Sequence, residues 1–164
     1  MSTGINTASP ITDWQWASFN QLSNHDVYAM MAARLHVFVL EQQCLWNDFD
    51  GLDLDAHHLL GWHEVDGKRV LGAYLRVLAP GAKYDEASIG RVLTTQAARG
   101  GGAGRALVAE GLQGVARLHP GAAVKIGAQR YLERFYGGFG FATISAPYDE
   151  DGIEHVDMLL DPPR

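Results

Sequence analysis

Four glycines in five consecutive positions, placed directly before a helix-like segment, constrain this chain most. The stretch Arg99-Gly100-Gly101-Gly102-Ala103-Gly104-Arg105 follows the apolar, strand-like segment 88–94. Glycine tolerates positive φ and leaves backbone amides open to a ligand, and the first turn of a helix carries N–H groups without intrahelical partners. This order of elements predicts an anion site, suited to a diphosphate, with Arg99 and Arg105 adding positive charge. The alternative that the glycines form only a flexible loop stays open on this pattern.

Two common phosphate motifs do not fit the stretch. A nucleotide-triphosphate loop requires Lys-Ser or Lys-Thr after its last glycine, where this chain has Arg105-Ala106. A dinucleotide fingerprint requires a third glycine at a position that Arg105 or Leu107 occupies, depending on the register. The site therefore belongs to another class of phosphate-containing ligand.

The remaining periodicities predict one α/β domain over 11–164 behind a loose, polar tail over 1–10. A helix is expected to begin at Ser23, with Asp26 completing the cap and an apolar stripe formed by Val27, Met30, Met31, Leu35 and Phe38. Asp66-Gly67 predicts a hairpin turn, and Pro120-Gly121 ends a second helix whose apolar face starts at Leu107. Strands are expected at 57–65, 69–79, 88–94, 123–128, 141–148 and 155–160, with a short helix at 130–138. This order implies a mixed sheet with helices on its faces.

Cysteine content and the lack of an apolar leader favour a cytoplasmic protein. Cys44 is the only cysteine, so no internal disulfide can form, and no apolar signal or membrane-spanning run is present. The net charge of -6 argues against nucleic acid and for small cationic partners. We expect no membrane contact, and a homodimer is a further expectation.

The glycine stretch resembles the acetyl-CoA motif of the GNAT superfamily of N-acetyltransferases, in which Gln or Arg is followed by two residues, Gly, one residue, and Gly or Ala. Arg99 to Gly104 matches this pattern. A second segment, Gln129-Arg-Tyr-Leu-Glu-Arg-Phe-Tyr136-Gly-Gly-Phe-Gly-Phe141, is similar to the family's stretch that contains a Phe-Tyr pair. Gln129 stands where the family usually has asparagine, which leaves the role of that position open.

The N-terminal half resembles the ElaA-type branch of this superfamily. That branch shows an Arg-x-x-Val-Phe-Val-x-Glu-Gln segment, an Asp-x-Asp-Gly-x-Asp loop and a following histidine. The matching positions here are Arg34, Val37, Phe38, Val39, Glu41, Gln42, Asp48, Asp50, Gly51, Asp53 and His57.

The resemblance implies a GNAT fold, with a mostly antiparallel sheet and helices on both faces, that moves an acetyl group from acetyl-CoA to a primary amine. It implies that the strand ending at Leu93 and Thr94 splays from its neighbour to admit the pantetheine arm. The implied cofactor-binding positions are Leu93, Thr94, Arg99, Gly100, Gly101, Gly102, Ala103, Gly104, Arg105, Gln129 and Tyr136. Tyr136 is the implied acid for the leaving thiolate; the alternative is that it only packs within an aromatic cluster.

The acceptor amine must lose a proton before it attacks, and a set of polar residues is available for this. The candidates for binding the acceptor or removing its proton are His36, Glu41, Asp48, Asp50 and Asp53. A group of carboxylates attracts an ammonium ion but also raises its pKa, so we expect water or His36 to take the proton. The alternative is that these acids form only a solvated loop.

Metal binding is not expected. The acidic loop lacks calcium-loop spacing, since Leu59 stands at the twelfth position from Asp48, and His57 and His58 would face opposite sides of a strand. Two other functions stay as alternatives: a non-catalytic acyl-CoA-binding sensor and, with less support, a metal-dependent hydrolase.

Overall fold

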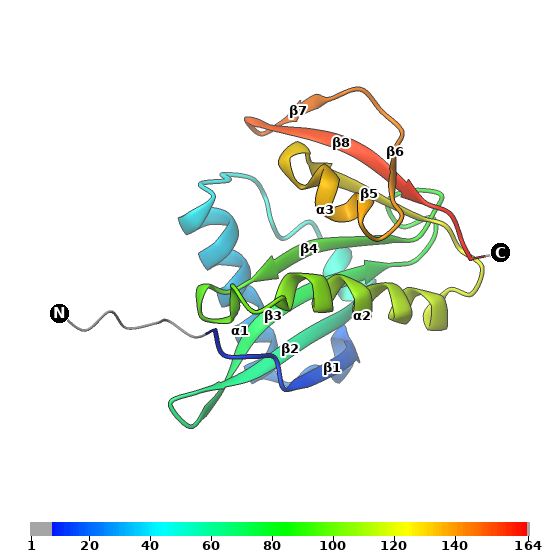
Figure 1. Ribbon diagram of the computed structural model, residues 1–164. Helices are drawn as coiled ribbons and strands as arrows, with labels where there is room; N and C mark the ends of the chain where they lie inside the picture. The colour runs from blue at the N-terminus through cyan, green and yellow to red at the C-terminus, as the bar shows by residue number, and fades with distance from the viewer. Residues whose placement is uncertain (1–7, 164) are drawn as a thin grey trace.

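The computed structural model describes residues 8–163, which form two groups of antiparallel strands (Figure 1). The first sheet has the order β1 (Asp13–Ser18), β2 (His57–Val65), β3 (Lys68–Leu78) and β4 (Ser88–Thr94). The second has the order β5 (Val124–Gln129), β8 (Ile153–Leu160) and β6 (Ala142–Thr143), and β7 (Tyr148–Glu150) also pairs with β8. A parallel bridge between Ala87 and Val124 joins the two sheets. The predicted mixed sheet is confirmed.

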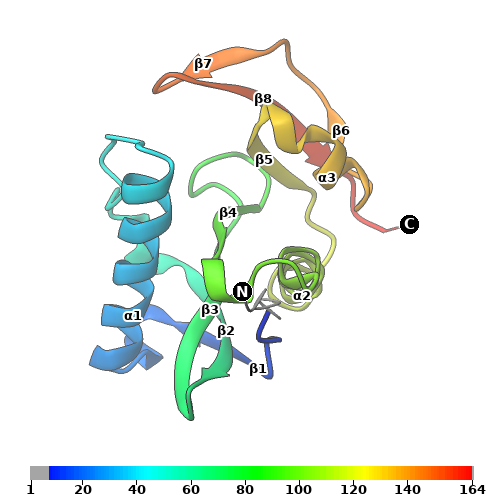
Figure 2. The same cartoon turned by 60° about the vertical axis from the view of Figure 1, so that its left-hand side comes forward.

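The two longer helices cover opposite faces of the first sheet, as Figure 2 shows for α1 (Asn24–Arg34) and α2 (Ala103–Leu118). A π-helix, Leu35–Glu41, continues α1, and the short α3 (Glu133–Gly137) packs beside the second sheet. Short 3-10 turns lie at Phe19–Gln21, Leu52–Asp55, Gln96–Ala98 and Arg130–Leu132. The helices therefore cover both faces, as the sequence predicts.

The predicted start of α1 is confirmed, but its apolar stripe is only partly right. The backbone N–H of Asp26 donates to Ser23 Oγ, and that of Ser23 donates to Asp26 Oδ2, both at 3.0 Å. Met30 is buried, whereas Leu35 is 54% exposed. Arg34 is buried on the inward face in its place, because its guanidinium forms ion pairs with Asp48 and Asp53 beneath the helix.

The predicted turns are confirmed, whereas the segment 141–148 is not one continuous strand. Asp66 and Gly67 have φ of 50° and 73°, as a tight hairpin turn requires. In the C-terminal segment, β6 ends at Thr143 and β7 begins at Tyr148. The backbone N–H of Asp157 in β8 donates to Ser145 Oγ at 2.8 Å in place of a ladder bond, and Pro147 has no N–H to offer.

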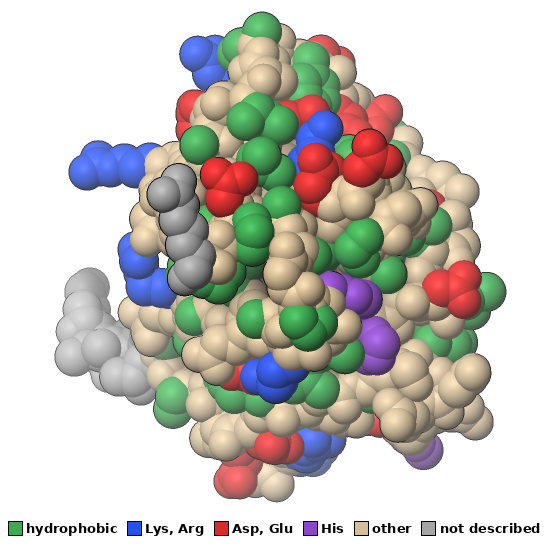
Figure 3. Space-filling view, turned by 90° about the vertical axis from the view of Figure 1, so that its right-hand side faces the viewer, with side chains coloured by type: hydrophobic (Ala, Val, Ile, Leu, Met, Phe, Trp, Pro, Cys, Tyr) green, Lys and Arg blue, Asp and Glu red, His purple; other side chains and the backbone are tan. Residues whose placement is uncertain are grey.

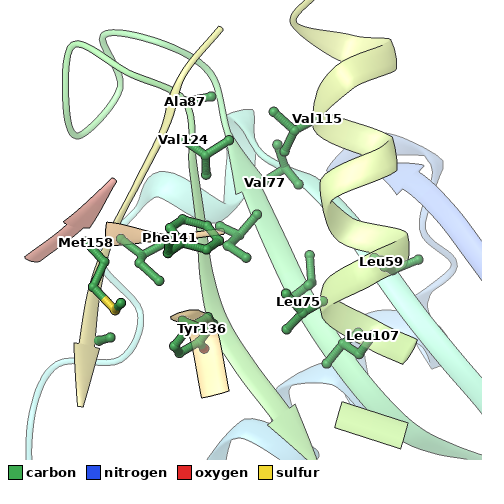
Figure 4. Packing of buried hydrophobic residues seen from close by; sticks show 14 of the residues in the cluster. Leu59, Leu75, Val77, Ala87, Leu107, Val115, Val124, Tyr136, Phe141 and Met158 are labelled. Atoms are coloured by element: carbon green, nitrogen blue, oxygen red, sulfur yellow. The ribbon is translucent and has the colours of Figure 1, made fainter. Parts of the chain in front are cut away.

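One hydrophobic core holds the two sheets together. Leu75 and Leu107, from β3 and α2, share a buried cluster with Phe141, which directly precedes β6, and with Met158 of β8 (Figure 4). Two glycines let α2 approach the sheet closely: a Cβ at Gly111 would lie 2.7 Å from Leu75, and one at Gly114 would overlap the ring of Trp16. A second cluster lies under α1 and includes Met30, Phe38 and Trp62.

Residues 1–7 of the predicted tail lie outside the described residues. Ser9, within that tail, is held against the domain, since its N–H donates to the carbonyl of Ala97 at 3.2 Å and its hydroxyl to the carbonyl of Glu64 at 2.7 Å.

Candidate functional site

The glycine loop has the backbone conformation that an anion site requires. Gly100 and Gly102 adopt φ of 92° and 80°, and Gly102 directly precedes α2. A Cβ at either position would meet nothing within 4 Å, so the space beside the loop is open. Open amides at the start of a 16-residue helix favour a negatively charged group.

The two arginines beside the loop have different surroundings. Arg99 donates to the carbonyl of Thr94 from Nε at 3.1 Å and from Nη2 at 2.7 Å, and Nη2 also lies 2.8 Å from Glu41 Oε2. Arg99 thus ties the end of β4 to the π-helix. The guanidinium of Arg105 lies 5.7 Å from the ring centre of Phe139.

The strands β4 and β5 separate beyond their bridge. Ala87 donates to the carbonyl of Ala123 at 3.1 Å, and Lys125 donates to the carbonyl of Ala87 at 2.8 Å. No other ladder pair joins the two strands within 8–163. A β-bulge in β4 opposite Tyr74 and Arg76, with Arg91 at φ of 55°, changes the direction of the strand at this point.

A cavity of about 150 Å³ lies where the strands separate. Its wall includes Ser88 to Val92 of β4, Ile126 to Gln129 of β5, and side chains from the π-helix, β3, β7 and β8. Among the residues predicted for the site, Gln129 and Tyr136 line this cavity. Leu93 is instead buried in the cluster under α1.

Tyr136 both packs in the core and reaches the cavity wall. Its side chain is 6% exposed and makes edge contacts with the rings of Phe135 and Phe141 (Figure 4). Burial raises the pKa of its hydroxyl above the ordinary value, so the hydroxyl keeps its proton at neutral pH. The position of Tyr136 is therefore compatible with both alternatives raised by the sequence, an acid for the leaving thiolate and a packing residue in an aromatic cluster.

Gln129 does not cap the following turn with its side chain. Its Nε2 donates to Oε1 of Gln42 in the segment after the π-helix, at 3.2 Å. This bond connects the second sheet to the segment that follows α1.

The acidic loop is paired internally, so its charge lends no support to the hypothesis that it attracts a cationic substrate. Asp48 Oδ2 lies 2.8 Å from Arg34 Nε, and Asp53 Oδ1 lies 2.7 Å from Arg34 Nη1. Asp50 Oδ2 lies 2.6 Å from Nη2 of Arg76, which also contacts Asp53 through Nη1 at 2.9 Å.

Arg91 completes this network, since its Nε lies 2.6 Å from Asp48 Oδ1. Three carboxylates thus face three guanidinium groups, and the opposite charges within this described network are equal in number. Burial alone would raise the pKa of Asp53, but hydrogen bonds from Arg34 and Arg76 outweigh it and hold the pKa below its ordinary value.

The network extends into the sheet through His58. Its Nδ1 lies 2.7 Å from the hydroxyl of Tyr74 and its Nε2 lies 2.9 Å from the carbonyl of Asp53. Burial lowers the pKa of His58, so the ring is neutral near pH 7. The sequence signal for this network was an arginine flanked by apolar residues in each of three segments, at Arg34, Arg76 and Arg91, and the sequence reasoning did not use it.

His36 and Glu41, the other candidates for the acceptor site, do not line the cavity. The Nε2 of His36 lies 3.5 Å from Glu41 Oε1, and its side chain is 57% exposed. The histidine that does line the cavity is His155 in β8, which the sequence reasoning missed. His155 reaches the cavity wall because β8 pairs with both β5 and β7.

Within residues 8–163, no group of three or more His, Cys, Asp or Glu side chains is arranged to hold a metal ion. None of the described helices is long and apolar enough to cross a membrane. On the face seen in Figure 3, basic side chains are dispersed among acidic and hydrophobic ones and form no continuous stripe.

A family model described as an acetyltransferase (GNAT) domain matches residues 56–162. A UPF0039 protein of Synechocystis is 44% identical over 90% of this chain and 94% of its own length. Protein ElaA of Escherichia coli is 38% identical over 89% of this chain and 94% of its own length.

Solved structures agree with these matches. The crystal structure of an acyl-CoA N-acyltransferase from Pseudomonas aeruginosa has a TM-score of 0.82 and 39% identity, covering 90% of this chain and 99% of that one. The crystal structure of Escherichia coli ElaA has a TM-score of 0.81 and 37% identity, covering 90% of this chain and 97% of that one. With its glycine loop, its splayed strands and these matches, the chain belongs to the GNAT acetyltransferase family.

Proposed function

We propose that this protein transfers the acetyl group of acetyl-CoA to a primary amine of a small molecule or peptide, by direct attack in a ternary complex. The observation that carries the proposal is the cavity between β4 and β5, whose strand β4 leads into the glycine loop before α2. An open pair of strand edges beside an anion-binding helix start suits a long ligand that carries a diphosphate at one end.

The residues fit acetyl-CoA as a co-substrate in two respects. The open space beside Gly100 and Gly102 leaves room for phosphate oxygens against the backbone amides. The backbone of β4 between Ser88 and Val92 lines the cavity and is not paired with β5 there, so its polar groups are available to an extended ligand arm. A fixed N–H on this edge would stabilise negative charge that develops on a thioester carbonyl oxygen.

Tyr136 is the group we assign to protonate the departing sulfur. It lines the cavity and holds a proton at neutral pH, while burial raises its pKa and makes the hydroxyl a weaker acid than an exposed tyrosine. The acceptor amine, in contrast, must lose a proton before it can attack. An amine with a lysine-like pKa near ~10.4 is neutral in only about one molecule in 2,500 at pH 7, which corresponds to roughly 4.6 kcal/mol.

The experiment is a panel of amines incubated with the protein and acetyl-CoA while free thiol is followed. Steady thiol release with at least one amine is expected. Calorimetry with coenzyme A separates the alternatives: binding without turnover would identify an acyl-CoA sensor, and the absence of binding would contradict both functions.

A further inference from the structure

His155 occupies a fixed and buried place on the wall of the cavity. It lies on β8, is 3% exposed, and pairs in register with Gln129 of β5 and Tyr148 of β7. The ring of Tyr148 stacks on the imidazole, with centroids 6.0 Å apart and an angle of 25° between the planes. Strands on both sides therefore hold the ring in one orientation.

The hydrogen bonds of His155 define what each ring nitrogen can do. Nδ1 lies 2.8 Å from the carbonyl oxygen of Ile153. A carbonyl oxygen only accepts, so Nδ1 carries a hydrogen and the neutral ring keeps its lone pair on Nε2. Nε2 is therefore the nitrogen that can accept a proton.

A carboxylate stands beside that nitrogen. Glu150 Oε2 lies 3.4 Å from His155 Nε2, and the side chain of Glu150 is 45% exposed. Both residues line the cavity, so this pair faces the same space as Tyr136. A negative charge at this distance stabilises the imidazolium that forms when Nε2 takes up a proton.

The other charged groups on the wall are cationic. Arg76 and Arg91 belong to the network with the three aspartates, and Lys83 comes from the β3–β4 connection. Burial lowers the pKa of Lys83, and Glu150 opposes this effect. Tyr131 and Tyr136 are the remaining titratable groups on the wall. Among the described residues that line the cavity, His155 is the sole imidazole and Glu150 the sole carboxylate.

We propose that His155 is the catalytic base that deprotonates the acceptor amine, and that Glu150 is its positioning residue. The inference rests on the proposed function. One ammonium proton passes to Nε2; the nitrogen lone pair then forms the C–N bond with the thioester carbon, and the C–S bond breaks with its electron pair on sulfur. Sulfur takes a proton from Tyr136, which regains one from the substituted nitrogen, and His155 returns its proton to solvent.

The test uses the full chain, acetyl-CoA and an amine accepted by the wild-type protein. His155→Gln is expected to lower kcat/KM about 100-fold or more at neutral pH and to remove the limb of the pH profile that belongs to the base. Its affinity for coenzyme A, measured by calorimetry, is expected to stay within about two-fold of wild type. His25→Gln, on the exposed surface of α1, is the matched control and is expected to keep the wild-type profile.

Glu150→Gln provides a second measurement on a half-exposed side chain. Removing the carboxylate destabilises the imidazolium, so the base limb of the rate profile should move to lower pH. In an NMR titration without substrate, the pH at which the imidazole resonance of His155 changes should move in the same direction. If the pair were merely structural, the NMR titration would still move but the rate profile would stay in place.

The outcomes separate the two proposals. If wild type turns over and His155→Gln keeps both the rate and the pH profile of wild type, the role of His155 is overturned while the proposed function stands. If Glu150→Gln leaves the NMR titration in place, the role of Glu150 alone is overturned. Absence of turnover by wild type across the amine panel overturns the proposed function and this role with it.

Discussion

Arg34 and Asp53 form an ion pair in the interior of the protein, with Nη1 and Oδ1 2.7 Å apart and side-chain exposures of 0% and 6%. Breaking a buried pair by removing one partner leaves a charge without compensation. Arg34→Met is therefore expected to lower the free energy of unfolding by about 3–5 kcal/mol, measured by urea denaturation.

The matched control for this variant is Arg130→Met. Arg130 pairs with Glu154 at 2.7 Å, but both side chains are more than half exposed. This change should cost less than about 1 kcal/mol. Equal losses in the two variants would contradict the importance of the buried network.

Acid is expected to destabilise the protein in two stages. Burial holds the pKa of His58 below its ordinary value, so its contribution to stability is complete above about pH 6.5 and is lost as the unfolded chain takes up a proton below that pH. The pKa of Asp50 and Asp53 is also lowered, by bonds from Arg76 and Arg34 that outweigh burial. Their contribution is complete above about pH 4 and is lost below it.

Urea denaturation at a series of pH values checks this expectation. Asp50→Asn should be less stable than wild type at pH 7 and should flatten the decline below about pH 4, because one of the titrating carboxyls is gone. A wild-type free energy of unfolding that is constant from pH 7 to pH 3 would be incompatible with the lowered pKa values.

Gly102→Ala tests the glycine loop as a ligand site. A methyl group there adds strain at a φ of 80° and projects into the open space beside the loop. Gly67→Ala is the matched control, since Gly67 has a φ of 73°, also meets nothing within 4 Å, and lies in the β2–β3 turn. Both variants should lose about 1 kcal/mol of stability.

Only Gly102→Ala should lower the affinity for coenzyme A, by about ten-fold or more in calorimetry. Its methyl group competes with the phosphate oxygens for the space beside the loop amides. If both variants bind coenzyme A as wild type does, the diphosphate lies elsewhere.

Gly114→Ala tests the packing of α2 on the first sheet. The added methyl group would overlap the ring of Trp16, which would have to shift together with its bond from Nε1 to Glu110. We expect a loss of about 1–3 kcal/mol in thermal or urea unfolding. Gly137→Ala in α3, where a Cβ meets nothing within 4 Å, should be neutral or slightly stabilising. A neutral Gly114→Ala would show that Trp16 can move freely.

Local signals in the sequence predicted much of the fold. The cap at Ser23, the Asp66-Gly67 turn, the strand over 88–94 and the helix end before Pro120 depend on neighbouring residues, and all four are confirmed. The glycine loop was recognised for the same reason, since its conformation depends on residues adjacent in the chain.

Features that depend on distant residues were not predicted. The partners of the acidic loop come from α1, β3 and β4, and only the folded chain brings Arg34, Arg76 and Arg91 together. His155 reaches the cavity because β8 inserts between β5 and β7, a strand order that the sequence pattern does not encode. Charge alone therefore suggested a substrate site where the structure has an internal network.

Among residues 8–163, one bridge, between Ala87 and Val124, joins the two sheets, and this affects how relatives with this architecture could diversify. Where neighbouring strands run as a full ladder, their spacing is dictated by backbone hydrogen bonds and is the same in every protein. Past this bridge no ladder fixes the separation of β4 and β5 within 8–163, and the two sheets are held by packing in a shared core that includes Phe141. Exchange of a few interior residues can thus resize the opening between the two sheets while every ladder of the described chain stays intact.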